Sequence, residues 1–67
     1  MTQKELLYVE DAIGHEENII SILNESISFL EDEDLVSFMG KELKKHESMR
    51  DMLMNKLEDA CKWTIDF

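Results

Sequence analysis

The chain has 67 residues and a net charge of -9, from 16 acidic and 7 basic side chains. Such a charge repels the phosphate backbone of nucleic acids and the anionic surface of membranes. The chain contains no apolar run of about 18 residues that would span a bilayer. Its first residues lack the basic start and apolar middle of a signal peptide. We therefore expect no nucleic acid partner, no membrane span and a cytoplasmic location.

Two long helices are the expected elements, because proline is absent and only the acidic run 31–34, near the midpoint, is hostile to a helix. The spacing of Thr2 and Glu5 is that of a capping box, which predicts a helix start. Asp32 or Asp34 is the expected N-cap of the second helix. The sequence therefore predicts an all-α, antiparallel two-helix hairpin, with helices at about 3–30 and 34–61.

In the first predicted helix, a seam of residues recurs at alternating steps of three and four, as in the helices of a bundle. Seven of its eight members are apolar, and Glu16 is the exception. Ala12, Ile19 and Ile22 widen the stripe enough for contact with more than one neighbouring helix. The seam consists of Leu6, Val9, Ile13, Glu16, Ile20, Leu23, Ile27 and Leu30.

The second predicted helix has a similar stripe, which His46 and Arg50 interrupt. The stripe consists of Val36, Met39, Leu43, His46, Leu53, Leu57 and Ala60, with Leu35, Phe38, Met49 and Met52 along its side. From the two stripes we predict that the main interface residues are Leu6, Ile13, Ile20, Ile27, Met39, Leu43, Leu53 and Leu57.

A second copy of the chain is the simplest way to complete the core. A chain this short buries only about 60% of its unfolded surface, and two helices cannot enclose a core between them. Two hairpins related by a two-fold axis form a four-helix bundle with a self-complementary interface. The basic side chains Lys41, Lys44, Lys45 and Arg50 can lie beside the more acidic first helix, either within the hairpin or across this homodimer.

The last residues, 62–67, are interpreted as a tail after a hairpin of residues 1–61. Trp63, Ile65 and Phe67 alternate as in a strand, and this segment either folds over the bundle end or docks on another protein. Cys61, the only cysteine, is interpreted as a small packed residue. Gly14 and Gly40 lie inside the helices, where glycine lowers the stability of the helix. Each indicates either a close approach of helices or a loss of stability that the helix tolerates.

Polar clusters occur in both helices, at His15, Glu16 and Glu17 and at Glu42, His46 and Glu47. Antiparallel packing brings His46 level with the region from Glu16 to Asn18, so the clusters meet in space. One hypothesis is a divalent metal site for iron, manganese or zinc, with Glu16, Glu17, Glu42 and His46 as ligands. The alternative is a buried pair, with Glu16 bonded to His46 or Arg50 and no cofactor.

The runs Tyr8-Val9-Glu10-Asp11-Ala12-Ile13-Gly14-His15-Glu16 and Lys44-Lys45-His46-Glu47 resemble small ferritin-like helical proteins of clostridia and bacilli, including spore coat proteins of that class. The resemblance covers roughly residues 5–58. It implies a four-helix, ferritin-like bundle and association with the spore. In metal-binding members such as rubrerythrins the second helix carries Glu-x-x-His, whereas here Leu43 stands three residues before His46. Glu10, Glu16 or Glu17 matches the first-helix glutamate.

Three hypotheses for the function follow. The first is a non-catalytic structural or interaction protein, a homodimeric helical bundle of spore coat type. The second is a metal-binding bundle, and the third is a regulatory hairpin that binds a signalling protein. The serine-containing motif of two-helix phosphatases of that kind is absent, because Ser37-Phe38-Met39-Gly40 occupies its place. No nucleophile has a paired base at a persuasive spacing, so we predict no catalytic residues.

Overall fold

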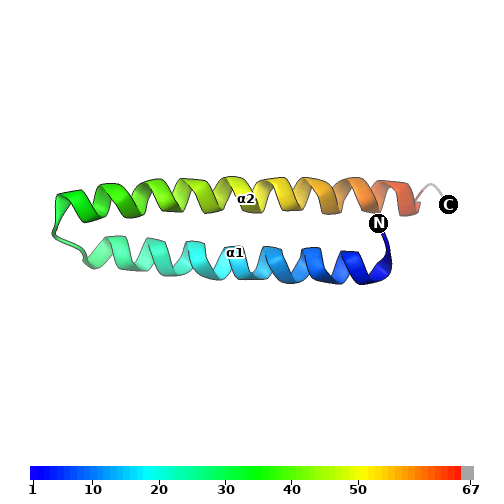
Figure 1. Ribbon diagram of the computed structural model, residues 1–67, viewed down its shortest axis with the longest axis horizontal. Coiled ribbons are helices and arrows are strands. Elements are labelled where there is room, and N and C mark those ends of the chain that lie inside the picture. The colour runs from blue at the N-terminus through cyan, green and yellow to red at the C-terminus, as the bar shows by residue number, and fades with distance from the viewer. Residues whose placement is uncertain (66–67) are drawn as a thin grey trace.

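The fold is a single hairpin of two long helices. A computed structural model describes the backbone of residues 1–65 and the side chains of residues 1–60. Helix α1 (Gln3–Phe29) and helix α2 (Glu33–Ile65) run antiparallel along their whole contact (Figure 1). The Cα trace is a rod of 53 × 15 × 13 Å. The all-α helical hairpin expected from the sequence is confirmed.

The first helix begins at the predicted capping box. The backbone N–H of Glu5 donates to Thr2 Oγ1 at 3.1 Å, and the backbone N–H of Thr2 donates to Glu5 Oε1 at 2.8 Å. These bonds satisfy amide groups that have no partner inside the helix. The hydrogen bonds from Thr2 to the Glu5 carboxylate, the backbone one foremost, lower the pKa of Glu5 below its usual value.

A short connection separates the two helices. Leu30 caps α1 with an extended backbone, and its N–H donates to the carbonyl of Ile27. Asp32 then starts α2, since its Oδ1 accepts from the backbone N–H of Leu35 at 3.0 Å. Of the two predicted N-caps, Asp32 is therefore the one that the structure uses. Glu33 and Asp34 lie in the first turn of α2, where the helix dipole favours negative charge.

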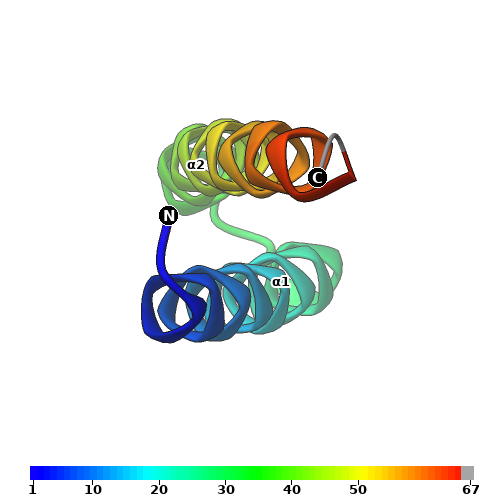
Figure 2. The same ribbon diagram turned by 90° about the vertical axis from the view of Figure 1, so that its right-hand side faces the viewer.

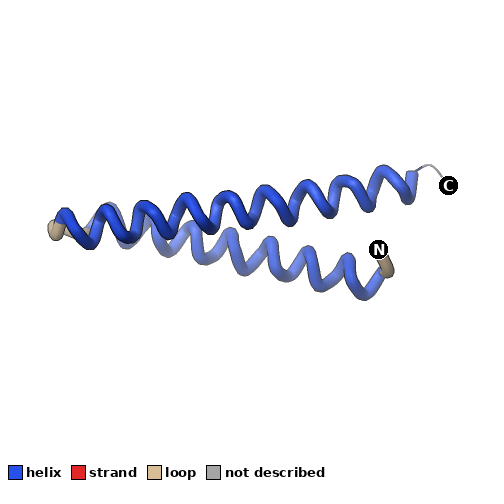
Figure 3. Tube along the Cα trace, turned by 45° about the horizontal axis from the view of Figure 1, so that its top comes forward, coloured by secondary structure: helices blue, strands red, loops and turns tan. Residues whose placement is uncertain are grey.

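Both predicted stripes lie on the shielded side of their helices. Every residue of the eight-residue seam of the first helix and of the seven-residue main stripe of the second is buried or half-buried, and so are all eight predicted interface residues. Ile20, with 8% of its surface exposed, is the only described side chain that counts as buried. We call the residues of the α1 seam and of the main stripe of α2 together the seam. Figures 2 and 3 show why it is a single line of contact: the two helices cross at a shallow angle, and within residues 1–65 no third element covers them.

The second helix continues past its predicted end at residue 61. Its backbone is helical to Ile65, so the alternation of Trp63 and Ile65 does not mark an extended segment. An isolated strand has no neighbour to accept its backbone hydrogen bonds, whereas a continued helix supplies them internally. The predicted roles of Cys61, Trp63, Ile65 and Phe67 depend on side chains outside the described part of the molecule.

Candidate protein interaction surface

A polar pair crosses the middle of the seam. His46 Nδ1 lies 2.5 Å from Glu16 Oε2, and the ring nitrogen is the donor because a carboxylate oxygen carries no hydrogen. The two side chains are 21% and 12% exposed, respectively. The predicted contact between the two polar clusters is confirmed, and the partner of Glu16 is His46 rather than Arg50. The pair ties α1 to α2 at a defined level of the hairpin.

Most of the other charged side chains do not link the helices. Arg50 Nη2 bonds Asp51 Oδ1 at 3.2 Å, a pair within α2 that the sequence analysis missed because it considered only partners on the other helix. Among the side chains that the structure describes, Lys41, Lys44 and Lys45 form no ion pair with α1. The within-hairpin pairing expected for these bases is therefore not observed.

The four candidate metal ligands are only partly brought together. Glu16 and His46 are in contact, whereas Glu17 is exposed on the neighbouring flank of α1. Glu42 lies one turn before His46 and is half-buried. Within residues 1–60, no group of three or more His, Cys, Asp or Glu side chains is close enough to hold a metal ion. Glu16 and His46 therefore do not form the four-ligand metal site of the hypothesis together with Glu17 and Glu42.

Large apolar side chains outside the seam are exposed. Phe38 and Met52 expose 58% and 64% of their surface, and Leu35 and Met49 also count as exposed. On α1, Ala12 and Ile19 are half-buried beside the seam. Because the local two-fold axis of an antiparallel pair is perpendicular to the plane of the helices, equivalent flanks of α1 and α2 lie on the same side of the hairpin. We call the surface formed by Ala12, Ile19, Leu35, Phe38, Met49 and Met52 the broad face.

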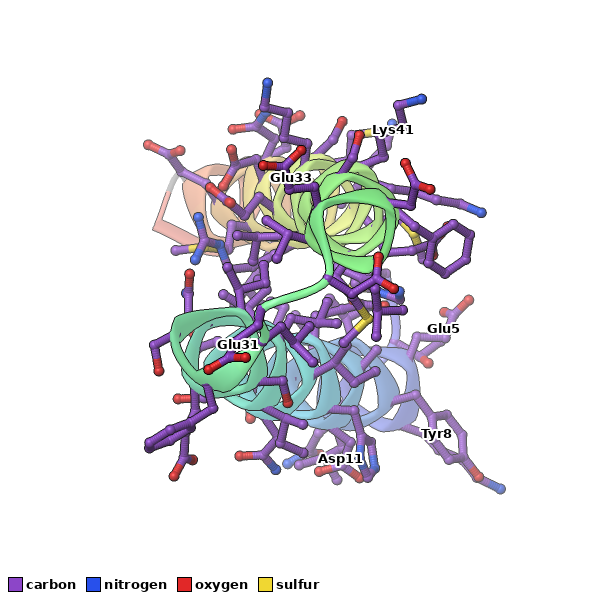
Figure 4. All side chains as sticks on the ribbon, turned by 90° about the vertical axis from the view of Figure 1, so that its left-hand side faces the viewer. Glu5, Tyr8, Asp11, Glu31, Glu33 and Lys41 are labelled. Carbon is purple, nitrogen blue, oxygen red and sulfur yellow. The ribbon has the colours of Figure 1, made fainter. Side chains whose placement is uncertain are left out.

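Three further apolar residues border the broad face on α1. Tyr8, Ile22 and Phe29 are 63%, 60% and 78% exposed. Figure 4 shows Glu5 and Tyr8 of α1 projecting from the same side of the hairpin as Lys41 of α2, whereas Asp11 points away from α2. The sequence had assigned Ile22 to a widened stripe that contacts a neighbouring helix. In the hairpin itself no helix covers it.

The opposite flanks of the two helices are acidic. Glu10 and Glu17 follow the seam of α1 by one residue, and Glu33 and Glu47 occupy the equivalent flank of α2. By the same two-fold argument these four side chains share one side of the hairpin, which we call the acidic face. Leu7 of α1 and Met54 of α2 are exposed apolar residues on that side, at 58% and 47%. The hairpin therefore has one side suited to packing and one suited to water.

The two glycines are not needed for the contact between α1 and α2. A Cβ atom added at Gly14 or Gly40 would meet nothing within 4 Å, and neither residue has a positive φ. Close approach of the two helices of one hairpin therefore does not explain them.

Comparison of the chain with protein-family models, with curated proteins and with solved structures found no match in any of the three. No helix within the described range combines the length and the hydropathy that a bilayer crossing needs.

Proposed function

We propose that the protein is a non-catalytic structural or interaction protein that works as a homodimeric four-helix bundle. The observation that carries this proposal is the near absence of a core, since Ile20 alone among the described side chains is buried. A folded domain normally needs many fully buried apolar side chains to offset the loss of chain entropy. One hairpin does not supply them, and a second apolar layer on the broad face would.

The shape of the hairpin supports the same proposal. Its Cα radius of gyration is 15.5 Å, whereas a compact chain of this length has a radius of about 11 Å. Its accessible surface is 5545 Å², whereas a compact monomer of this mass exposes about 4,400 Å². An isolated hairpin thus exposes roughly a quarter more surface than a compact monomer.

The surface that a dimer would bury lies in the range of permanent interfaces. Two separate hairpins expose twice 5545 Å², and a compact particle of twice the mass exposes about 7,300 Å². Reaching that value requires the burial of about 3,800 Å² in total, which falls within the roughly 2,000 to 5,000 Å² of obligate homodimers. A second copy therefore fits the missing area as well as the missing core.

Within this proposal the bundle serves assembly. The paired broad faces would leave the acidic faces outward, where they are available for contacts with cationic partners or for solubility. A role as a spore coat component follows from the sequence resemblance alone and stays a prediction.

Sedimentation equilibrium of the full chain at micromolar concentration tests the dimer. The matched variants are Met52→Lys on the broad face and Met54→Lys on the acidic face, because the same change is made at two exposed sites of α2. We expect a wild-type dimer, a dissociation constant raised roughly tenfold or more by Met52→Lys, and little change from Met54→Lys. A wild-type protein that is monomeric and melts cooperatively would overturn the proposal, as would equal effects of the two variants.

A further inference from the structure

The broad face carries charged side chains as well as apolar ones, and their order along α2 restricts how a second copy can pack. From the turn toward the open end, the flank of α2 that bears the broad face presents Leu35, Phe38, Glu42, Lys45, Met49 and Met52, and Lys56 and Asp59 follow. Two apolar residues come first, then one acid and one base, then two apolar residues. Neither Glu42 nor Lys45 has an ion-pair partner among the side chains that the structure describes.

We propose that two copies of the chain pack broad face to broad face, with the α2 helices antiparallel and Glu42 of each copy opposite Lys45 of the other. This inference rests on the homodimer proposed above and adds its face and its register. In this arrangement Phe38 packs on the partner's Met49, and Leu35 packs on the partner's Met52. The pattern is self-complementary, as a two-fold interface requires.

Other registers of the same two helices fit poorly. Sliding one helix by about two turns in one direction would place Leu35 on the partner's Lys45 and Phe38 on the partner's Glu42. A slide in the opposite direction would place Met49 on the partner's Lys45 and Met52 on the partner's Glu42. Both slides bury an unpaired charge against an apolar side chain, which is unfavourable. Of these three registers, only the proposed one places apolar residues on apolar residues and each acid opposite a base.

The open-ended shape of the hairpin also fits an antiparallel pair of α2 helices. Its turn end carries Leu35 and Phe38, and Met49 and Met52 lie toward the open end. An antiparallel dimer places the turn end of one copy over the open end of the other, so that both apolar patches are covered. All four neighbouring helix pairs in the resulting bundle are antiparallel, and their helix dipoles are then favourably arranged.

Charge reversal tests the proposed pairing of Glu42 with Lys45. Glu42→Lys gives a chain with two bases at these positions, and Lys45→Glu gives a chain with two acids. We expect each variant alone to dimerise roughly tenfold more weakly, because like charges then face each other twice across the two-fold. An equimolar mixture should form mainly the heterodimer, which native mass spectrometry detects when one chain carries a mass tag.

The matched control is the next acid and base on the same flank of α2. Asp59→Lys and Lys56→Glu make the same changes at the same spacing, but the proposed register does not bring these positions together. We expect both control variants to dimerise like the wild type and to mix statistically. Preferential heterodimers from the control pair, or none from the test pair, would contradict the register.

Disulfide formation tests the same register independently, in a Cys61→Ser background. The double variant Phe38→Cys, Met49→Cys should form dimers linked by disulfides under mild oxidation. The two positions are about 16 Å apart along one helix, too far for a bond within the chain. The variant Ser37→Cys, Ser48→Cys has the same spacing on other sides of α2 and should stay unlinked.

The outcomes separate this inference from the function on which it rests. A monomeric wild type would mean that the broad face is kept for a different protein, and both proposals would fall. A wild-type dimer without the Phe38→Cys, Met49→Cys link would overturn the register alone. Efficient linking of Leu35→Cys, Lys45→Cys would mean a shifted register and would also overturn it.

Discussion

The seam and the broad face contain similar apolar residues, but the chain covers only one of them. Along the seam, α1 and α2 shield each other, and Ile20 reaches 8% exposure. On the broad face, Phe38 and Met52 remain more than half exposed. The seam holds the hairpin in its fold, whereas in the proposed dimer the broad face provides the free energy of association.

The largest expected effect is on the seam. We expect Ile20→Ala to lower the free energy of unfolding by about 2 to 5 kcal/mol, because it removes the best-buried side chain and leaves a cavity. Urea denaturation followed by circular dichroism measures this change. Leu7→Ala is the control, since Leu7 is 58% exposed and its truncation should cost about 0.5 kcal/mol or less. Similar losses in both variants would mean that the seam is not the main source of stability.

The polar pair inside the seam should come next. We expect Glu16→Ala or His46→Ala to cost about 1 to 3 kcal/mol, because each leaves a shielded polar group without its partner. Replacing both residues with leucine should be neutral or stabilising. A double-mutant cycle in urea measures the coupling. Additive effects would show that the 2.5 Å contact contributes nothing to stability.

A smaller effect is expected at the start of α1. Thr2→Ala removes the side-chain oxygen that accepts from the backbone N–H of Glu5. Loss of such an N-cap costs about 1 kcal/mol. Thermal unfolding measures it, and Thr2→Ser should retain most of the stability. An unchanged melting temperature in Thr2→Ala would mean that the first turn frays in solution.

Replacing a glycine inside a helix is expected to raise the stability of the hairpin, whereas the substitutions above lower it. Gly40→Ala should stabilise the hairpin by about 0.5 to 1 kcal/mol, since alanine is the better helix former. The added Cβ meets nothing within 4 Å. Gly40 lies on the flank of the acidic face, so dimerisation should be unchanged. A weaker dimer in Gly40→Ala would mean that a partner packs closely there instead of on the broad face.

The smallest effect is a dependence on pH at Glu5. Its pKa in the folded chain is lowered from the usual 4.5 by the hydrogen bonds from Thr2. The stabilisation is therefore fully present above the unfolded-state pKa and is lost as the pH falls through the folded-state pKa. The stability difference between wild type and Glu5→Gln, measured by urea denaturation, should shrink as the pH is lowered from 7 to 3. A stability difference that does not change with pH would exclude the Glu5 carboxylate as the source of this stabilisation.

Periodicity was sufficient to predict the seam, because burial in a two-helix contact follows the helical repeat. Thr2, Glu5 and Asp32 were predictable for a local reason, since their partners lie within a few residues. The sequence did not show that α2 continues to Ile65, because short aromatic alternation occurs in both strands and helices. The ion pair between Arg50 and Asp51 was also not predicted, because only a partner on the other helix was expected for Arg50. Glu16 and His46 were predicted to lie together. A metal site needs further ligands, and the described part of one hairpin does not bring these to the pair.

The location of the acidic face limits how far assembly can proceed. If each copy binds an identical copy through its broad face, no broad face is left uncovered once the second molecule has bound. The remaining surface of the pair carries Glu10, Glu17, Glu33 and Glu47 outward, with twice the net charge of -9. Colloidal repulsion between such particles opposes further growth, so the stoichiometry stops at two rather than extending into fibres.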